Sequence, residues 1–185
     1  MPAIRQGLAK GCGGQDWLTG WVGGDVLDPA LIKGGFIMTE RPLSEIKFLV
    51  VHHSVTSKDA TIGQIREIHL ARGYSDIGYH YLISAGGLKE GRDIRFRGAH
   101  ALSEKAPYLD TDMNRAGAGL CIIGDFSKAP PDDNLINETA FAVKRIAGKL
   151  GIKIDRKHII PHSAVSYTAC PGKGTMEKIY TKLGI

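Results

Sequence analysis

The chain contains no apolar run of about 18 residues, the length that a helix needs to cross a lipid bilayer. Its first residues, from Met1 to Lys10, also lack the continuous apolar core of a secretory signal peptide. The sequence therefore predicts neither a membrane-spanning helix nor a cleaved leader. We expect a protein that is made in the cytoplasm without a signal peptide and stays there until another agent releases it.

Cysteine is scarce, and its spacing does not fit a disulfide framework. The three cysteines, Cys12, Cys121 and Cys170, are odd in number and far apart in the chain. Cys121 lies in an apolar, strand-like run and is expected to be a small buried hydrophobic residue. Cys170 stands before a Pro-Gly pair, and it is the cysteine whose neighbours suggest a chemical role.

Runs of basic residues are absent as well, and aromatic residues are few. The net charge is +5 and the isoelectric point about 9.1, but the lysines and arginines are scattered and aromatics make up only 7%. A dedicated nucleic-acid module usually concentrates its positive charge, so stable nucleic-acid binding is not expected. The positive balance favours other polyanionic surfaces, such as an anionic cell wall or anionic lipid.

The 185 residues, 43% of them hydrophobic and 23% charged, suit one ordinary globular domain with a short extension. Residues 1–44 are rich in glycine, which disfavours long regular elements, yet they carry Trp17 and Trp21. We interpret them as an extension that packs along the domain. The alternative is an arm that meets a protein partner. The remaining residues, 45–185, form the predicted domain.

Alternating strand and helix patterns predict an α/β fold, a single domain with a central mixed sheet flanked by helices. The helix over 61–71 places Ile65 and His69 on one face, so His69 is expected to pack against the core. Asn137 is predicted to cap the second helix, in which Phe141 occupies an apolar position. A long loop over 98–118 is typical of functional segments. Strands are predicted over 46–52, 77–84, 88–91, 119–126 and 159–160, and helices over 61–71, 138–150 and 175–183.

Two histidines and a cysteine form the strongest chemical pattern. His52 ends a buried strand, and alternation along that strand places His53 on the opposite face. His162 follows another short strand, and Cys170 lies eight residues later in a turn. A histidine at a strand end is more often a plain polar residue than a ligand. Two imidazoles and a thiolate together, however, favour a zinc site with an open fourth position, the arrangement of a hydrolase.

The order and spacing of four segments resemble the zinc-dependent N-acetylmuramoyl-L-alanine amidases. That family includes phage lysozymes of the amidase type and the peptidoglycan recognition proteins, and the resemblance covers about residues 46–182. It implies one zinc ion held by His52, His162 and Cys170. It also implies cleavage of the amide between the lactyl group of muramic acid and the first L-alanine of the stem peptide. The segments are 48–54, 77–81, 98–101 and 162–172.

The resemblance also suggests roles for other polar residues. Tyr79 matches the family's catalytic tyrosine, although such a residue alone would be interpreted as a sheet tyrosine. Thr168 stands where phage lysozymes often carry a lysine, and its hydroxyl is a candidate oxyanion donor. No general base is evident. His100 and His53 are candidates for that role and for binding substrate, and Asn114 is expected to bind substrate or to cap its loop.

Among the functions that the resemblance implies, a phage or prophage endolysin fits best. It would be a monomer that acts on peptidoglycan, and its positive charge would help it to hold an anionic envelope. Wall-recycling amidases usually carry an aspartate at the position of Cys170, which argues against that role. The alternatives are a peptidoglycan-binding module without hydrolysis and a regulator whose N-terminal region binds a polymerase.

Overall fold

The computed structural model describes residues 32–33 and 36–185 of the chain. The predictions for Cys12, Trp17 and Trp21 therefore lie outside the described residues. The described part of the extension includes a small antiparallel pair, β1 (Ile32–Lys33) and β2 (Phe36–Ile37). Within the described ranges, none of the helices has the length and apolar character to cross a membrane.

One mixed, five-stranded sheet in the order β5-β4-β6-β3-β7 forms the centre of the fold. Strands β4, β6, β3 and β7 run parallel, and β5 pairs antiparallel with β4 at one edge. The predicted α/β class with a central mixed sheet is confirmed. The strands are β3 (Phe48–His53), β4 (Tyr81–Ser84), β5 (Gly87–Glu90), β6 (Gly117–Ile122) and β7 (Ile159–Pro161).

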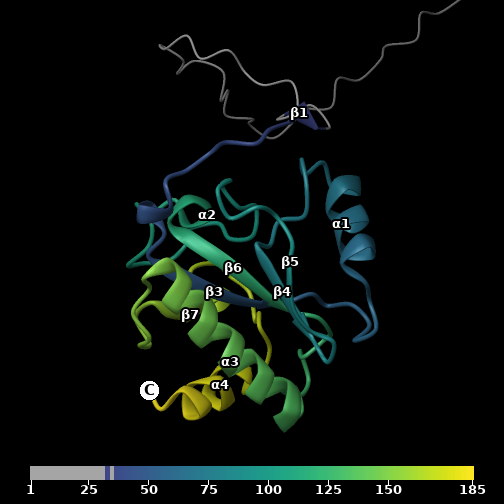
Figure 1. The fold of residues 1–185 in the computed structure, drawn as a ribbon, viewed down its shortest axis with the longest axis vertical. Coiled ribbons are helices and arrows are strands. Elements are labelled where there is room, and N and C mark those ends of the chain that lie inside the picture. The colour runs from purple at the N-terminus through teal and green to yellow at the C-terminus, as the bar shows by residue number, and fades with distance from the viewer. Residues whose placement is uncertain (1–31, 34–35) are drawn as a thin grey trace, which may run out of the picture.

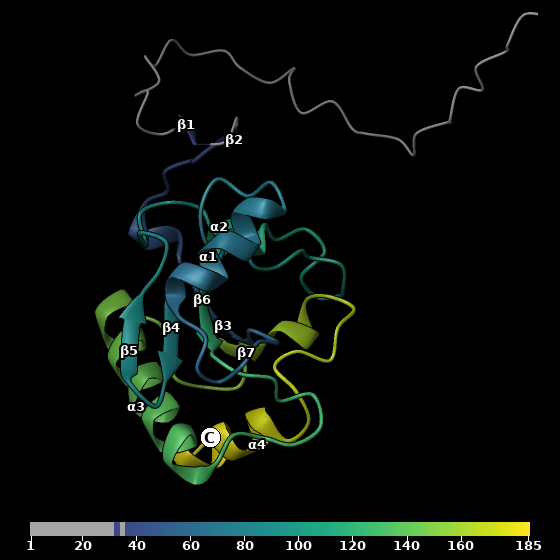
Figure 2. The same cartoon turned by 90° about the vertical axis from the view of Figure 1, so that its right-hand side faces the viewer.

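Helices cover both faces of this sheet (Figures 1 and 2). Figure 1 shows α3 running across one face with α4 beside it, near the C-terminus, while α1 lies apart from them. The helices are α1 (Ile62–Ala71), α2 (Met113–Ala116), α3 (Asp133–Leu150) and α4 (Thr175–Leu183), with short 3-10 helices η2 (Leu43–Glu45) and η3 (His162–Ala164).

Alternation along β3 divides its side chains between the two layers. Leu49 and Val51 pack into the large core under α3 and α4, and both are fully buried. Val50 and His52 point to the other face, because successive side chains of a strand alternate. Because β3 lies between β6 and β7, neither edge of the strand is exposed, and His52 is 1% exposed.

Several element predictions are confirmed by the structure. Helix α1 begins with a capping box between Thr61 and Gln64, and Ile65 and His69 are its buried residues. Helix α4 spans the predicted residues 175–183. Cys121 is completely buried in β6, as expected of a small hydrophobic residue.

The predicted start of the helix over 138–150 is wrong. Helix α3 begins five residues earlier, at Asp133, because the carboxylate of Asp132 accepts a hydrogen bond from the Leu135 N–H and caps the first turn. Asn137 therefore lies inside the helix. Phe141, one of the apolar positions predicted for this helix, is 59% exposed.

Candidate metal centre and active site

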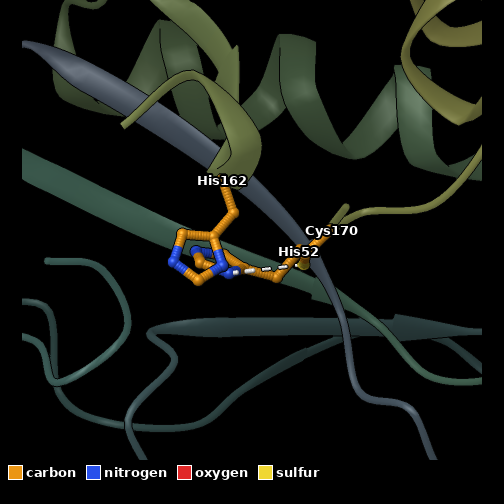
Figure 3. A group of neighbouring side chains, drawn as sticks. All are labelled: His52, His162 and Cys170. Atoms are coloured by element: carbon orange, nitrogen blue, oxygen red, sulfur yellow. Dashed lines mark hydrogen bonds between the residues drawn. The ribbon is translucent and has the colours of Figure 1, made fainter. Parts of the chain in front are cut away.

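His52, His162 and Cys170 converge at one point beside the sheet (Figure 3). One donor atom from each side chain lies within 4.8 Å of the others. The Nδ1 atom of His52 is 3.9 Å from the Sγ atom of Cys170, and the His52 and His162 ring centroids are 4.4 Å apart. The structure thus brings together the three residues that the sequence predicts as ligands.

Parallel pairing explains why two of these residues meet. Strands β3 and β7 are parallel neighbours, so their carboxyl ends share one edge of the sheet. His52 lies near the end of β3, and His162 follows Pro161 at the end of β7. The backbone N–H of Ser163 donates to the carbonyl of Cys170 at 2.9 Å, which ties the cysteine loop to the same edge.

Gly172 lets the cysteine loop approach the rest of the domain. Its φ is +100°, and a Cβ atom there would lie 2.1 Å from the carbonyl oxygen of Phe126. A larger residue would push the loop away and carry Cys170 with it. The backbone N–H of His53 donates to the Cys170 Sγ at 3.3 Å, which orients the sulfur from the other side.

Burial sets the protonation of all three side chains. It holds the pKa of His52 well below its usual range, with the His162 ring adding to the effect, and it lowers the pKa of His162 to about 4. Both imidazoles are therefore neutral at pH 7 and have a free lone pair. Burial also raises the pKa of the Cys170 thiol to about 11, partly offset by the His53 N–H. A cation beside the sulfur would reverse that shift.

Tyr79 and Thr168 both lie at this centre. The ring centroid of Tyr79 is 5.1 Å from that of His52, and burial raises the pKa of its phenol well above the ordinary value. The phenol therefore remains a proton donor at neutral pH. The Thr168 hydroxyl oxygen accepts a hydrogen bond from the Cys170 N–H at 3.2 Å, which leaves its own O–H free to donate elsewhere.

His100, a candidate for substrate binding, contacts His52 directly. The ring is buried, with Nδ1 3.1 Å from His52 Nε2 and Nε2 3.3 Å from the carbonyl oxygen of Gly117. Both ring nitrogens are thus engaged by protein atoms, and His100 also lines a cavity beside the three converging residues.

Asn114 and His53 also have protein partners. The Asn114 Oδ1 accepts from the backbone N–H groups of His100 and Ala101, so this side chain caps its loop and only its amide nitrogen remains for a ligand. The His53 Nδ1 accepts from the Phe126 N–H at 3.0 Å, on the opposite face from His52. Its ring is 5% exposed.

Two cavities adjoin at His162, one of the three converging residues. A cavity of about 450 Å³ lies on one side and one of about 420 Å³ on the other, and His162 and Thr168 line both. The second also contains Tyr79, His53 and Cys170. Together they provide room for an extended substrate on either side of the centre.

Two exposed side chains that line the larger cavity, Tyr167 and Leu102, were not predicted from the sequence. Tyr167 is 78% exposed and Leu102 66% exposed, and both line it together with Tyr74 and Glu104. The ammonium group of Lys105 lies 5.0 Å from the Tyr167 ring centroid. The sequence does place an aromatic residue, Tyr167, in the loop between His162 and Cys170. Nothing in the sequence shows that its side chain faces solvent beside the site.

Comparisons with known proteins agree with this geometry. Residues 42–173, well over half of the chain, match the N-acetylmuramoyl-L-alanine amidase family. The endolysin of Klebsiella phage KP32 is 28% identical over 131 residues, which cover 69% of this chain and 81% of that protein. A peptidoglycan-recognition protein of Drosophila simulans is 25% identical over 153 residues, 75% of each chain.

Solved structures give the same result. The amidase LysC from Clostridium intestinale URNW superposes with a TM-score of 0.65 at 27% identity, covering 80% of this chain and 91% of that one. Peptidoglycan recognition protein-LE, solved in complex with tracheal cytotoxin, superposes with a TM-score of 0.64 at 26% identity, covering 82% and 88%. The fold, the converging side chains and the family match together place this chain in the N-acetylmuramoyl-L-alanine amidase family.

Proposed function

We propose that this protein is a zinc-dependent peptidoglycan amidase that hydrolyses the amide between N-acetylmuramic acid and the L-alanine of the stem peptide. The observation that carries the proposal is the convergence of His52, His162 and Cys170 beside two cavities that His162 lines, in a chain of the amidase family. Tyr79 and Thr168 supply hydrogen-bond donors at the same place.

The residues present fit a zinc ion. Zinc–nitrogen and zinc–sulfur bonds of 2.0–2.3 Å place neighbouring ligand atoms of a tetrahedral site about 3.5 Å apart, close to the 3.9 Å between His52 Nδ1 and Cys170 Sγ. Two neutral imidazoles and a thiol form a donor set that zinc prefers. A bound zinc ion would supply Lewis-acid chemistry, activating water as a nucleophile near neutral pH and polarising the amide carbonyl.

Residues of the protein would stabilise the developing negative charge and orient the substrate. Tyr79, which burial keeps protonated, would donate its phenol proton in a hydrogen bond to the carbonyl oxygen as negative charge develops there. Thr168 would add a second, uncharged donor, held in place by the N–H of Cys170. The two cavities would orient the glycan and the stem peptide on either side of the scissile bond.

The phage endolysins among the relatives support a role in host lysis. We propose that the protein is made in the cytoplasm, is released to the cell wall and degrades peptidoglycan there as a monomer. The net charge of +5 would strengthen its attraction to an anionic envelope.

Product analysis on wild-type protein and the Cys170→Ser variant tests this function. Purified peptidoglycan treated with wild-type enzyme should release stem peptides with a free L-alanine amino group and leave glycan strands intact. The variant, which lacks the thiolate ligand, should release none and bind no stoichiometric zinc. Cleavage within the glycan or within the peptide would contradict the proposal. Zinc binding without cleavage would instead favour a recognition module of the kind found among the relatives.

A further inference from the structure

We propose that His100 is a positioning residue that fixes the His52 ring with its Nδ1 lone pair directed at the metal centre. The inference rests on the zinc site proposed above. Metal-binding histidines usually donate their second ring N–H to a carboxylate, a backbone carbonyl or water. Here that partner is another imidazole, since His52 Nε2 lies 3.1 Å from His100 Nδ1.

The direction of these hydrogen bonds follows from the last acceptor in the series, the Gly117 carbonyl. His100 Nε2 faces the carbonyl oxygen of Gly117 at 3.3 Å, and a carbonyl only accepts, so Nε2 carries a proton. A neutral imidazole carries one N–H, so with Nε2 as the donor the Nδ1 atom of His100 is an acceptor. His52 must then donate from Nε2, and its lone pair resides on Nδ1, the atom nearest Cys170 Sγ.

The surrounding backbone is shaped to hold the His100 ring. A Cβ atom at Gly119 would lie 2.8 Å from two ring carbons of His100, and one at Gly98 would lie 2.5 Å from a ring carbon. Gly117 and Gly119 alternate onto the same face of β6, while Ala118 points into the opposite core. Gly119 of β6 therefore leaves the space that the His100 ring occupies, whereas a Cβ atom at Gly117 would instead contact Met113 and Val50.

Further contacts fix the His100 backbone and the Gly117 carbonyl. The backbone N–H of His100 donates to Asn114 Oδ1 at 2.7 Å, which anchors the residue that carries the ring. The buried guanidinium of Arg41 donates to the Gly117 carbonyl at 2.9 Å, which anchors the final acceptor. These contacts hold the His100 backbone and the Gly117 carbonyl in the positions at which the ring reaches His52.

The test compares two variants of nearly equal shape. Leucine at position 100 removes the acceptor, whereas the side-chain oxygen of asparagine can occupy the place of Nδ1. Zinc dissociation constants, measured by competition with a chromogenic chelator, should weaken about 10–100-fold in His100→Leu. His100→Asn should recover most of that loss. Gly119→Ala, which displaces the ring, should resemble His100→Leu and provides an independent variant if His100→Leu does not fold.

A core variant separates this role from general destabilisation. Ile146→Ala opens a cavity under α3, away from the site, and should lower stability while leaving the zinc dissociation constant unchanged. Equal zinc affinities in His100→Leu, His100→Asn and wild type would overturn the positioning role and leave the proposed amidase intact. If the wild-type protein binds no zinc, both the positioning role of His100 and the proposed zinc amidase are overturned.

Discussion

His52 and His53 serve the centre through different atoms. His52 contributes its ring, whereas His53 contributes its backbone N–H, which lies 3.3 Å from Cys170 Sγ. A backbone donor is present whatever the side chain at position 53. The ring of His53 accepts a hydrogen bond from Phe126, so it is part of the packing around the cysteine loop.

Removal of the Tyr79 hydroxyl should slow the chemical step without loss of metal. A single well-placed donor to a developing oxyanion contributes about 10²–10³ in kcat, so Tyr79→Phe should lose about that factor while its zinc content stays at the wild-type level. The measurement is steady-state release of stem peptide together with metal analysis.

Tyr180→Phe is the matched control for this change. It removes a hydroxyl that donates to the Ile159 carbonyl in the core behind the sheet. Its kcat should remain close to that of wild type. A kcat for Tyr79→Phe within about twofold of wild type would show that the phenol does not stabilise the developing oxyanion.

Residue types favoured a metal site, and the resemblance to the amidases implied its three ligands. His52 and His162 end or follow buried strands, whereas Cys170 lies in a turn. The position of His100 could not be predicted in the same way. Its partner His52 is 48 residues away, and the contact depends on the missing side chain at Gly119.

At the scale of elements, the cap of α3 can be tested directly. Asp132 accepts from the Leu135 N–H, whereas Asn137 is exposed within the helix. Asp132→Ala should therefore lower the free energy of unfolding by about 1 kcal/mol, and Asn137→Ala should change it little. Urea denaturation of both variants provides the comparison. A larger loss for Asn137→Ala would restore the helix start predicted from the sequence.

Elements with a local signal were predicted well. The capping box at Thr61 and the apolar spacing of α1 are properties of the adjacent sequence, and so is the periodicity of α4. The strand predicted over 77–84 is shorter in the structure, because only Tyr81–Ser84 pair with β5 and β6. Pairing depends on neighbouring strands, which a single segment does not reveal.

Arg41 ties the residues assigned to the extension to the rest of the domain. It lies within the residues assigned to the extension, yet it is 4% exposed and donates to the carbonyls of Asn114 and Gly117. Its guanidinium also lies 2.9 Å from His80 Nε2. An arginine among glycines and prolines in the sequence gives no sign of such burial.

For the whole molecule, buried neutral histidines should make stability depend on pH. Burial lowers the pKa of His69 to about 4 and holds that of His80 well below its usual range. Unfolded histidine has a pKa of about 6.5, so between these values the unfolded state binds more protons. The contribution of these histidines to the free energy of unfolding is therefore fully present above about pH 6.5. It decreases as the pH falls towards their pKa values in the folded protein.

The midpoint of urea denaturation of chelated protein should accordingly be lower at pH 5 than at pH 7. His69→Asn keeps an acceptor for the Gly78 N–H but removes one titrating ring. Its midpoint should change less between the two pH values. An equal or higher midpoint at pH 5 in the wild-type protein would show that these rings are not buried in their neutral form.

Metal removal and restoration test the central claim most directly. Protein treated with a strong chelator and then dialysed should release no stem peptide from purified peptidoglycan. One equivalent of zinc per chain should restore the activity, and Cys170→Ser should not recover. Full activity in the chelated protein, or zinc-restored activity in Cys170→Ser, would contradict the assignment of His52, His162 and Cys170 as the metal centre of a peptidoglycan amidase.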